Sequence, residues 1–188
     1  GEDWRFGHNR SGDVNFLQQE AARRGFELEA VAPVMHDGER VSSTRIRQAI
    51  RDGNLHAAEQ MLGRPYSVAG KVIEGKKFGR TIGFPTANLA TGEAQLPPDG
   101  VWAVRAILPD GRDLAGVANL GLRPTVEEDG SAKRQLEVHL FDHTGDLYGQ
   151  GIEVRFIQRL RDEMKMDSLD ALKAQIALDA VQARSALA

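Results

Sequence analysis

Beyond residue 65, hydrophobic positions gather in short runs rich in valine, isoleucine and aromatic side chains. Turn sequences such as Pro-Asp-Gly and Thr-Gly-Asp separate these runs, and the spacing is typical of a β-sandwich or a β-barrel. Asp110-Gly111, between two runs, is a strong hairpin signal. With a further strand expected near Asn88, the pattern predicts about six strands. The other five are expected over Tyr66 to Ile73, Val101 to Leu108, Leu114 to Asn119, Leu136 to Phe141 and Ile152 to Ile157.

The first 64 residues show a mixed pattern. The expected elements are a helix over 14–24 between Asp13 and Gly25, a strand over 26–35, a helix from Ser42, Ser43 or Thr44 to Ile50, and a short helix over 55–62. A strand followed by a helix is typical of a layered α/β unit, but one strand is too few for a sheet. We therefore interpret residues 1–64 as the end of an α/β domain and residues 65–188 as a second domain.

A last helix is expected from the N-cap Ser168 to about Leu187. Leu169, Leu172 and Ile176 recur on one face of this helix, and we interpret the stripe as core packing. The pattern therefore predicts a fold that is mainly β with flanking helices.

Composition narrows the class of protein. The 188 residues are 41% hydrophobic and 27% charged, which is ordinary for a globular chain that can bury a core. The absence of cysteine excludes disulfides, thiolate zinc sites and a cysteine nucleophile. No apolar run approaches the roughly 18 residues of a membrane span, and the acidic N-terminus lacks a signal-peptide layout. We therefore expect a cytoplasmic protein without a membrane partner, and the net charge of -3 argues against a nucleic-acid binder.

The glycine-rich stretch over residues 75–89 carries the strongest candidate chemistry. Glycine lets the backbone approach a bulky ligand, successive amides can surround an anion, and lysine and arginine add donors for phosphate oxygens. The stretch therefore predicts an anion site, with a solvated basic hairpin as an equally weighted alternative. Its relevant residues are Gly75, Lys76, Lys77, Gly79, Arg80, Gly83 and the sequence Pro85-Thr86-Ala87-Asn88.

The same stretch is not a Walker A phosphate loop. Lys77 stands where that motif requires serine or threonine, and a helix must follow directly. The sequences Phe-Gly-Arg and Gly-Phe-Pro that come next are not expected to tolerate a helix.

A second candidate is the strand that contains Glu137. Because alternate residues of a strand share a face, Glu137, His139 and Phe141 point one way, and the apolar residues between them point toward the core. Glu137 could line a ligand pocket, and the alternative is a solvent-facing strand edge. His139 and His143 are not expected to converge on a metal, because the second lies in a turn.

A third candidate is the helix start at residues 42–47. Hydroxyl groups and free amides at a helix N-terminus, followed by arginines, make a plausible phosphate site. Helix capping alone explains the hydroxyl groups, so only the arginines favour the phosphate interpretation. The residues are Ser42, Ser43, Thr44, Arg45 and Arg47.

Motifs in the second half of the chain closely resemble the riboflavin kinase module, in order and spacing, over about residues 62–188. They are Leu62-Gly63-Arg64-Pro65-Tyr66, Gly70-Lys71-Val72, Gly79-Arg80, Gly83-Phe84-Pro85-Thr86-Ala87-Asn88-Leu89, the run from Asn119 to Thr125, Leu136-Glu137-Val138-His139, Tyr148-Gly149 and the run from Arg159 to Lys165. The runs from Gly1 to Gly7 and from Val41 to Arg47 resemble the end of the FMN adenylyltransferase module, which precedes the kinase in bacterial bifunctional FAD synthetases.

The resemblance implies a six-stranded antiparallel β-barrel with a C-terminal helix, preceded by a partial α/β nucleotidyltransferase segment. It implies that ATP and Mg²⁺ are used to convert riboflavin to FMN, with Glu137 as general base and with Thr86 and Asn88 serving the metal and the phosphates. From the residues themselves we also assign Gly70, Lys76, Gly79, Arg80 and Gly83 to ATP, since loop amides and cations would hold the triphosphate. We assign the flavin ring to the region from Arg159 to Met166, with Arg159, Arg161 and Met166 as its contact residues.

Two departures from the family pattern matter. Residues 1–64 lack the early strand and the His-x-x-His-type motif of the adenylyltransferase, so we expect FMN but not FAD as a product. Met166 stands where the family tends to have phenylalanine, which is expected to change flavin packing little. The alternatives are a flavin- or nucleotide-binding module without catalysis and, more distantly, an RNA-binding barrel. Nothing in the sequence indicates an oligomeric state.

Overall fold

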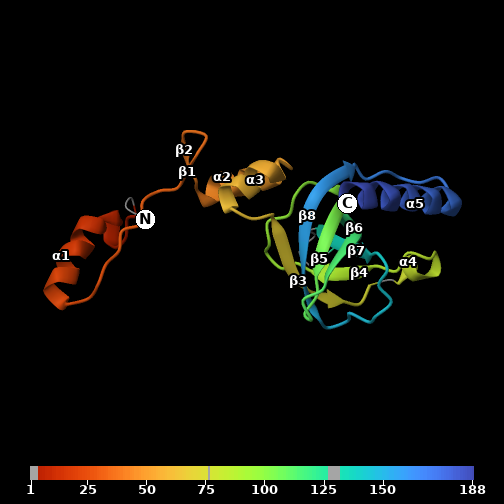
Figure 1. Ribbon diagram of the computed structural model, residues 1–188, viewed down its shortest axis with the longest axis horizontal. Coiled ribbons are helices and arrows are strands. Elements are labelled where there is room, and N and C mark those ends of the chain that lie inside the picture. The colour runs from red at the N-terminus through yellow and green to blue at the C-terminus, as the bar shows by residue number, and fades with distance from the viewer. Residues whose placement is uncertain (1–3, 76, 127–131) are drawn as a thin grey trace. The chain divides into compact units, whose positions relative to one another are not determined.

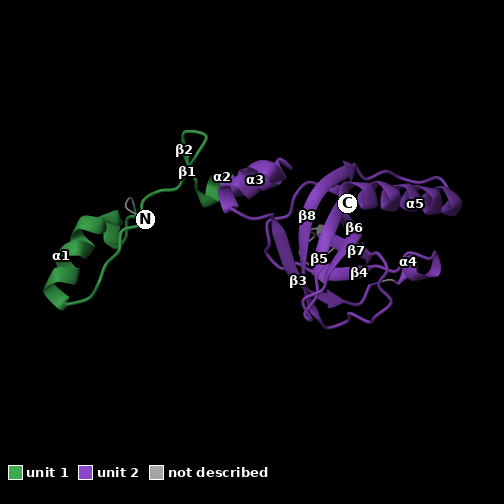
Figure 2. Cartoon of the chain, viewed as in Figure 1, with its two compact units in different colours: residues 1–45 green, residues 46–188 purple. Residues whose placement is uncertain are grey.

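The computed structural model describes residues 4–75, 77–126 and 132–188. The chain forms two compact units, residues 1–45 and residues 46–188 (Figure 2). Among the described residues, no helix combines the length and the apolar character needed to cross a membrane.

The second unit is built on a closed six-stranded barrel, which confirms the predicted architecture (Figure 1). All pairings are antiparallel, and the order around the barrel is β3-β4-β7-β6-β5-β8, so the pairing of β3 with β8 closes it. The strands are β3 (Ser67–Ile73), β4 (Ala87–Ala90), β5 (Gly100–Ile107), β6 (Asp113–Val126), β7 (Ala132–Leu140) and β8 (Gly151–Arg161).

The barrel interior is filled by alternate residues of each strand. On β7, Leu136, Val138 and Leu140 are buried in the core, as the alternation predicted. Trp102 is the largest fully buried side chain, and its indole Nε1 donates to the carbonyl of Pro98 at 3.1 Å. The residues between the inward-facing ones of β7 are left to face outward, and this is where the polar groups of the site lie.

Two helices ahead of the barrel contribute to the same core. These are α2 (Ser43–Arg51) and α3 (Leu55–Leu62). Ile50, Leu55 and Ala58 are buried in one cluster with the barrel interior. The helices therefore pack with the barrel, and the second compact unit begins upstream of the expected domain boundary at residue 64.

The C-terminal helix α5 (Leu169–Ala186) contacts β5, β6 and β8. Its N-cap is Ser168, whose hydroxyl accepts from the amide of Ala171 at 3.1 Å, so the predicted cap is confirmed. The predicted core stripe was partly wrong, because Leu169 is exposed and the next two stripe residues border a cavity. Burial is complete only later in the helix, at Asp179 and Ala183.

The first unit contains α1 (Val14–Arg24) and a short hairpin of β1 (Met35–His36) and β2 (Glu39–Arg40). The Asp13 carboxylate caps α1 by accepting from the amide of Phe16 at 2.9 Å. The predicted strand over 26–35 was wrong, because only its last residue lies in a strand. Positive φ angles at Asp37 and Gly38 make a tight turn there, and β2 supplies a partner for two residues only.

Candidate active site

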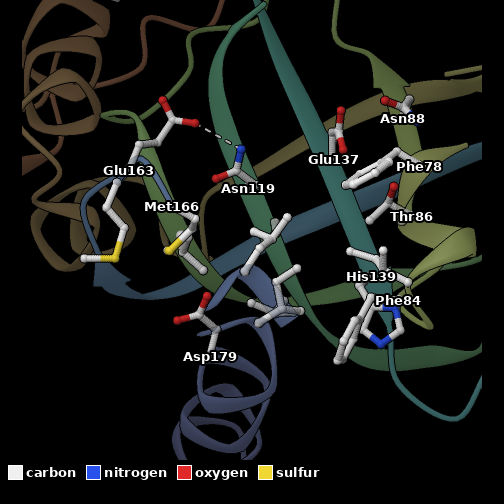
Figure 3. Close-up of a pocket in the computed structure, with 18 of the residues that line it drawn as sticks. Phe78, Phe84, Thr86, Asn88, Asn119, Glu137, His139, Glu163, Met166 and Asp179 are labelled. Atoms are coloured by element: carbon white, nitrogen blue, oxygen red, sulfur yellow. Dashed lines mark hydrogen bonds between the residues drawn. The ribbon is translucent and has the colours of Figure 1, made fainter. Parts of the chain in front are cut away.

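A cavity of about 490 Å³ opens between the barrel wall, α5 and the loop that carries the glycines. Figure 3 shows its labelled side chains, which come from α4, the segment between α4 and β4, β4, β6, β7, the segment after β8, and α5. One part of the lining is apolar and includes Ile82, Phe84, Val101, Val117 and Met166. A site of this size and mixed character suits a small organic ligand with a polar end.

The polar end is a row of three residues across three neighbouring strands. Asn88 on β4 pairs in register with Glu137 on β7, and Glu137 in turn pairs with Asn119 on β6. Opposed residues of an antiparallel ladder project to the same face with their Cβ atoms about 5 Å apart. The Glu137 carboxylate is therefore flanked by two amide side chains in the cavity wall, so the solvent-facing alternative for this strand does not hold.

Thr86 lies just before β4 and lines this cavity and a second one. The second cavity has a volume of about 540 Å³ and lies against the opposite face of β7, where Val138 and Leu140 contribute to its wall. Its other lining residues come from β3, from the glycine-rich stretch up to the start of β4 and from the loop after β7. They are Val72, Arg80, Pro85, Ala87, His143, Thr144, Gly145, Asp146, Leu147 and Tyr148.

The segment before Thr86 is held by a one-turn helix, α4 (Phe78–Thr81). The expectation that these residues tolerate no helix was therefore wrong for a single turn. The chain enters α4 at Lys77, which has a φ of 57°, and leaves the segment after α4 at Gly83, which has a φ of 91°. The positive φ at position 83 is a conformation that suits glycine. At Gly79 a Cβ atom would overlap the carbonyl oxygen of Phe84, so the close approach of α4 to this segment depends on glycine.

The residues that the sequence analysis assigned to ATP do not all lie in one cavity. Gly79, Thr86 and Asn88 line the first cavity, and Arg80 lines the second. Gly70 and Gly83 line neither. Gly70 instead sits where a Cβ would lie 2.6 Å from the carbonyl oxygen of Ala90, in the pairing of β3 with β4. Lys76 lies outside the described residues.

Of the residues assigned to the flavin ring, Arg161 and Met166 line the first cavity and Arg159 does not. The guanidinium group of Arg159 donates to the carbonyl of Asp99 and to the carboxylate of Asp162. Arg161 makes a two-point ion pair with Asp179 of α5, with distances of 2.8 Å from Nε to Oδ1 and 2.7 Å from Nη2 to Oδ2.

Asp179 is a site residue that the sequence reasoning missed. It is only 2% exposed, and Gln175 also donates to its Oδ1 at 2.9 Å. The available signal was an acid three residues after Ile176 on the face that had been interpreted as apolar. Glu163 was also missed as a site residue. Its Oε1 accepts from Asn119 Nδ2 at 3.1 Å at the cavity wall (Figure 3).

The helix start at residues 42–47 shows capping geometry. The Ser42 hydroxyl accepts from the amide of Arg45 at 3.3 Å. The Arg45 guanidinium donates to the carbonyl of Arg40 at 2.8 Å and pairs with Glu39 at 3.2 Å, so it is engaged in the hairpin. Ser43, Thr44 and Arg47 are exposed.

No cluster of three or more histidine, cysteine or acidic side chains that could hold a metal occurs among the described residues. The first cavity nevertheless offers the hydroxyl of Thr86, the amide oxygen of Asn88 and the carboxylate of Glu137. Oxygen donors in small number fit Mg²⁺, which keeps several waters and takes phosphate oxygens as its other ligands.

The family model described as riboflavin kinase matches residues 62–187, which span all six barrel strands and α5. The chain belongs to the riboflavin kinase family. A second family model, described as FAD synthetase, matches residues 1–45.

Among curated proteins, the bifunctional riboflavin kinase/FMN adenylyltransferase of Escherichia coli K12 is 45% identical over 98% of this chain. The protein of the same name from Haemophilus influenzae is 44% identical, also over 98% of the chain. The chain spans 58% and 59% of the lengths of these two relatives. The crystal structure of a macrolide-efflux protein from Streptococcus pneumoniae aligns over 95% of this chain and 56% of its own, with a TM-score of 0.75 and 36% identity.

Proposed function

We propose that this protein transfers the γ-phosphoryl group of ATP to the 5′-hydroxyl of riboflavin, giving FMN and ADP. The observation that carries the proposal is the position of Thr86, which lines two cavities that are each large enough for a substrate. A group that passes between two bound molecules must be transferred where their sites meet. Membership of the riboflavin kinase family supports the choice of substrates.

The first cavity is proposed to take riboflavin. Its apolar wall, with Phe84, Val101, Val117 and Met166, suits the flat face of an isoalloxazine ring. The row of Asn88, Glu137 and Asn119 offers hydrogen-bonding partners to the hydroxyl groups of the ribityl chain. Arg161, fixed by Asp179, is proposed to face the polar edge of the ring.

The second cavity is proposed to take ATP. Arg80 brings a cation to one end of it, and Tyr148 and Val72 bring apolar surface for an adenine ring. The Lys77 ammonium group lies 5.5 Å from the centre of the Tyr148 ring and pairs with Glu74 at 3.3 Å, and it is proposed as a second cation for the triphosphate. Cationic groups that surround a triphosphate lower the repulsion met by an attacking oxygen.

Thr86 and Asn88 would hold Mg²⁺ through their side-chain oxygens. When bound, the ion would neutralise charge on the β- and γ-phosphates. The same charge neutralisation explains why two uncharged oxygen donors are sufficient on the protein side, since the phosphates supply the anions.

Glu137 is proposed as the general base. Its carboxylate accepts the proton of the 5′-hydroxyl while the oxygen of that group forms a bond to the γ-phosphorus. The bond from the γ-phosphorus to the bridging oxygen breaks, and ADP leaves with the electron pair. Phosphoryl transfer depends mainly on position and charge, so the base must be close to the alcohol. The amides of Asn88 and Asn119, which flank Glu137, are proposed to hold the ribityl chain so that its 5′-hydroxyl lies near this carboxylate.

The test is incubation of the chain with riboflavin, ATP and Mg²⁺, followed by chromatography of the flavins. FMN is the expected product. A protein that only binds flavin or nucleotide would show calorimetric binding of both substrates and form no FMN, and this outcome would overturn the proposal. The same chromatogram reports FAD, which this chain is not expected to form.

The boundary of the kinase domain is proposed to lie near residue 65, close to the start of the match to the riboflavin kinase family at residue 62.

A further inference from the structure

His139 is a residue of the first cavity that the proposed chemistry does not use. It lies on the outer face of β7, two residues after Glu137, and it lines the first cavity. Its Nδ1 atom is 2.8 Å from the carbonyl oxygen of Pro85. Its ring also contacts Phe84 and Phe141 edge to face, with centroid distances of 5.6 and 5.8 Å.

The contact with Pro85 lies at the point where the pairing of β4 with β7 stops. The last pair in register is Ala87 with Val138, so the residues ahead of Ala87 are outside the ladder. Pro85 has no amide hydrogen and cannot extend a ladder as a donor. The Pro85 carbonyl can still accept, and the His139 side chain donates to it, which adds one hydrogen bond between the two segments beyond the end of the ladder.

A second tie holds the same segment from the other side. The amide of Phe84 donates to the carbonyl of Gly79 in α4 at 2.8 Å. Residues 84–86 are therefore hydrogen-bonded to α4 through the Phe84 amide and to β7 through the Pro85 carbonyl. Thr86 is the first residue after that carbonyl. Because that carbonyl belongs to the peptide unit whose amide is that of Thr86, a hydrogen bond to it fixes the plane from which the Thr86 side chain projects.

We propose that His139 is a positioning residue that holds Thr86 at the meeting point of the two cavities through the hydrogen bond from Nδ1 to Pro85. A carbonyl oxygen can only accept, so Nδ1 carries the hydrogen, and in the neutral ring Nε2 does not. The role of Thr86 in nucleotide binding rests on the proposed function, whereas the hydrogen bond that holds it does not.

The competing explanation is that His139 acts only as a ring that packs between Phe84 and Phe141. Three variants separate the two, because they keep different parts of the side chain. In His139→Asn the amide nitrogen occupies the place of Nδ1, and in His139→Gln it occupies the place of Nε2. His139→Phe keeps the ring and removes both nitrogens.

The hydrogen bond predicts that wild type and His139→Asn have similar KM values for Mg-ATP. It predicts a rise of roughly fivefold in His139→Gln and His139→Phe, since a net hydrogen bond is worth about 1 kcal/mol. Ring packing predicts the reverse order, with His139→Phe closest to wild type and the two amide variants impaired together. That order would overturn the proposal.

A measurement without substrates keeps the test independent of the proposed activity. The amide ¹⁵N shift of Thr86 reports the hydrogen bond to the preceding carbonyl. It should move in His139→Gln and stay near the wild-type value in His139→Asn, and both variants lose the ring current equally. Equal shifts in the two variants would refute the positioning role even if FMN is formed, and the expected difference would support it even if no FMN is formed.

Discussion

Asn88 and Glu137 lie directly opposite each other in the pairing of β4 with β7, and both side chains enter the same cavity. Asn88 is only 5% exposed, and its Oδ1 accepts from the amide of Gln135. Glu137 follows Asn88 by 49 positions in the sequence. The closed barrel therefore brings a residue proposed to hold the metal beside the proposed base.

Glu137→Gln is expected to lower kcat by roughly 10² to 10⁴-fold, because the amide cannot accept the proton of the alcohol. The KM for Mg-ATP should change little, since the carboxylate acts on the flavin hydroxyl. Steady-state kinetics of FMN formation measure both constants. The matched control is Glu153→Gln on β8, which lines neither cavity and should behave as wild type. A fall in kcat that is equal in both variants would argue against the base assignment.

Thr86→Ala is expected to weaken Mg-ATP binding and to shift the Mg²⁺ titration of activity to higher concentrations. The cause is the loss of the hydroxyl group that, among the described residues, is the only one shared by both cavities. Thr86→Ser keeps the hydroxyl and should stay within a few-fold of wild type. An alanine variant with the wild-type Mg²⁺ dependence would remove Thr86 from the metal site.

Asp179→Asn is expected to destabilise the fold by roughly 3 kcal/mol, since it leaves the partly buried Arg161 without its charge partner. Urea unfolding of wild type and of Asp179→Asn measures the difference in the free energy of unfolding. The control is Asp113→Asn, because Asp113 pairs with Arg105 and Arg155 in an ion-pair cluster whose side chains are at least 36% exposed. Exposed pairs contribute at most about 1 kcal/mol. Similar losses in the two variants would contradict the special role of the Asp179 pair.

Asp142 and Arg184 give a prediction for pH. Hydrogen bonds from Arg184, together with its charge, lower the pKa of the Asp142 carboxyl, and the same contact raises the pKa of Arg184. A carboxyl whose pKa is lower in the folded state stabilises the fold above its unfolded pKa of 3.8, and this stabilisation is lost as the pH falls through the folded pKa. Wild type should therefore be more stable than Asp142→Asn at pH 6, and the difference should disappear in acid below both pKa values. Thermal unfolding across this range tests the prediction, and a constant difference would refute it.

Strand positions and the core face of β7 were predictable because alternation and turn residues are local properties of the sequence. Leu136, Val138 and Leu140 are buried as expected, and Ser168 caps α5 as expected. The strand over 26–35 was not predictable, because a strand exists only where a partner is available, and β2 pairs with two residues. The single turn of α4 was missed for a related reason, since the hydrogen bond from the Phe84 amide to the Gly79 carbonyl offsets the weak helix propensity of Gly79.

By itself, the sequence determined the number of barrel strands, the face of β7 to which Glu137 belongs and the basic, glycine-rich character of the loop before β4. Only the tertiary structure decided that Asp179 pairs with Arg161 at the cavity, that Arg159 points elsewhere and that Thr86 belongs to two cavities. The physical reason is the range of the interactions. Alternation and capping act over a few residues, whereas a cavity is made by segments that barrel closure and helix packing bring together from distant parts of the chain.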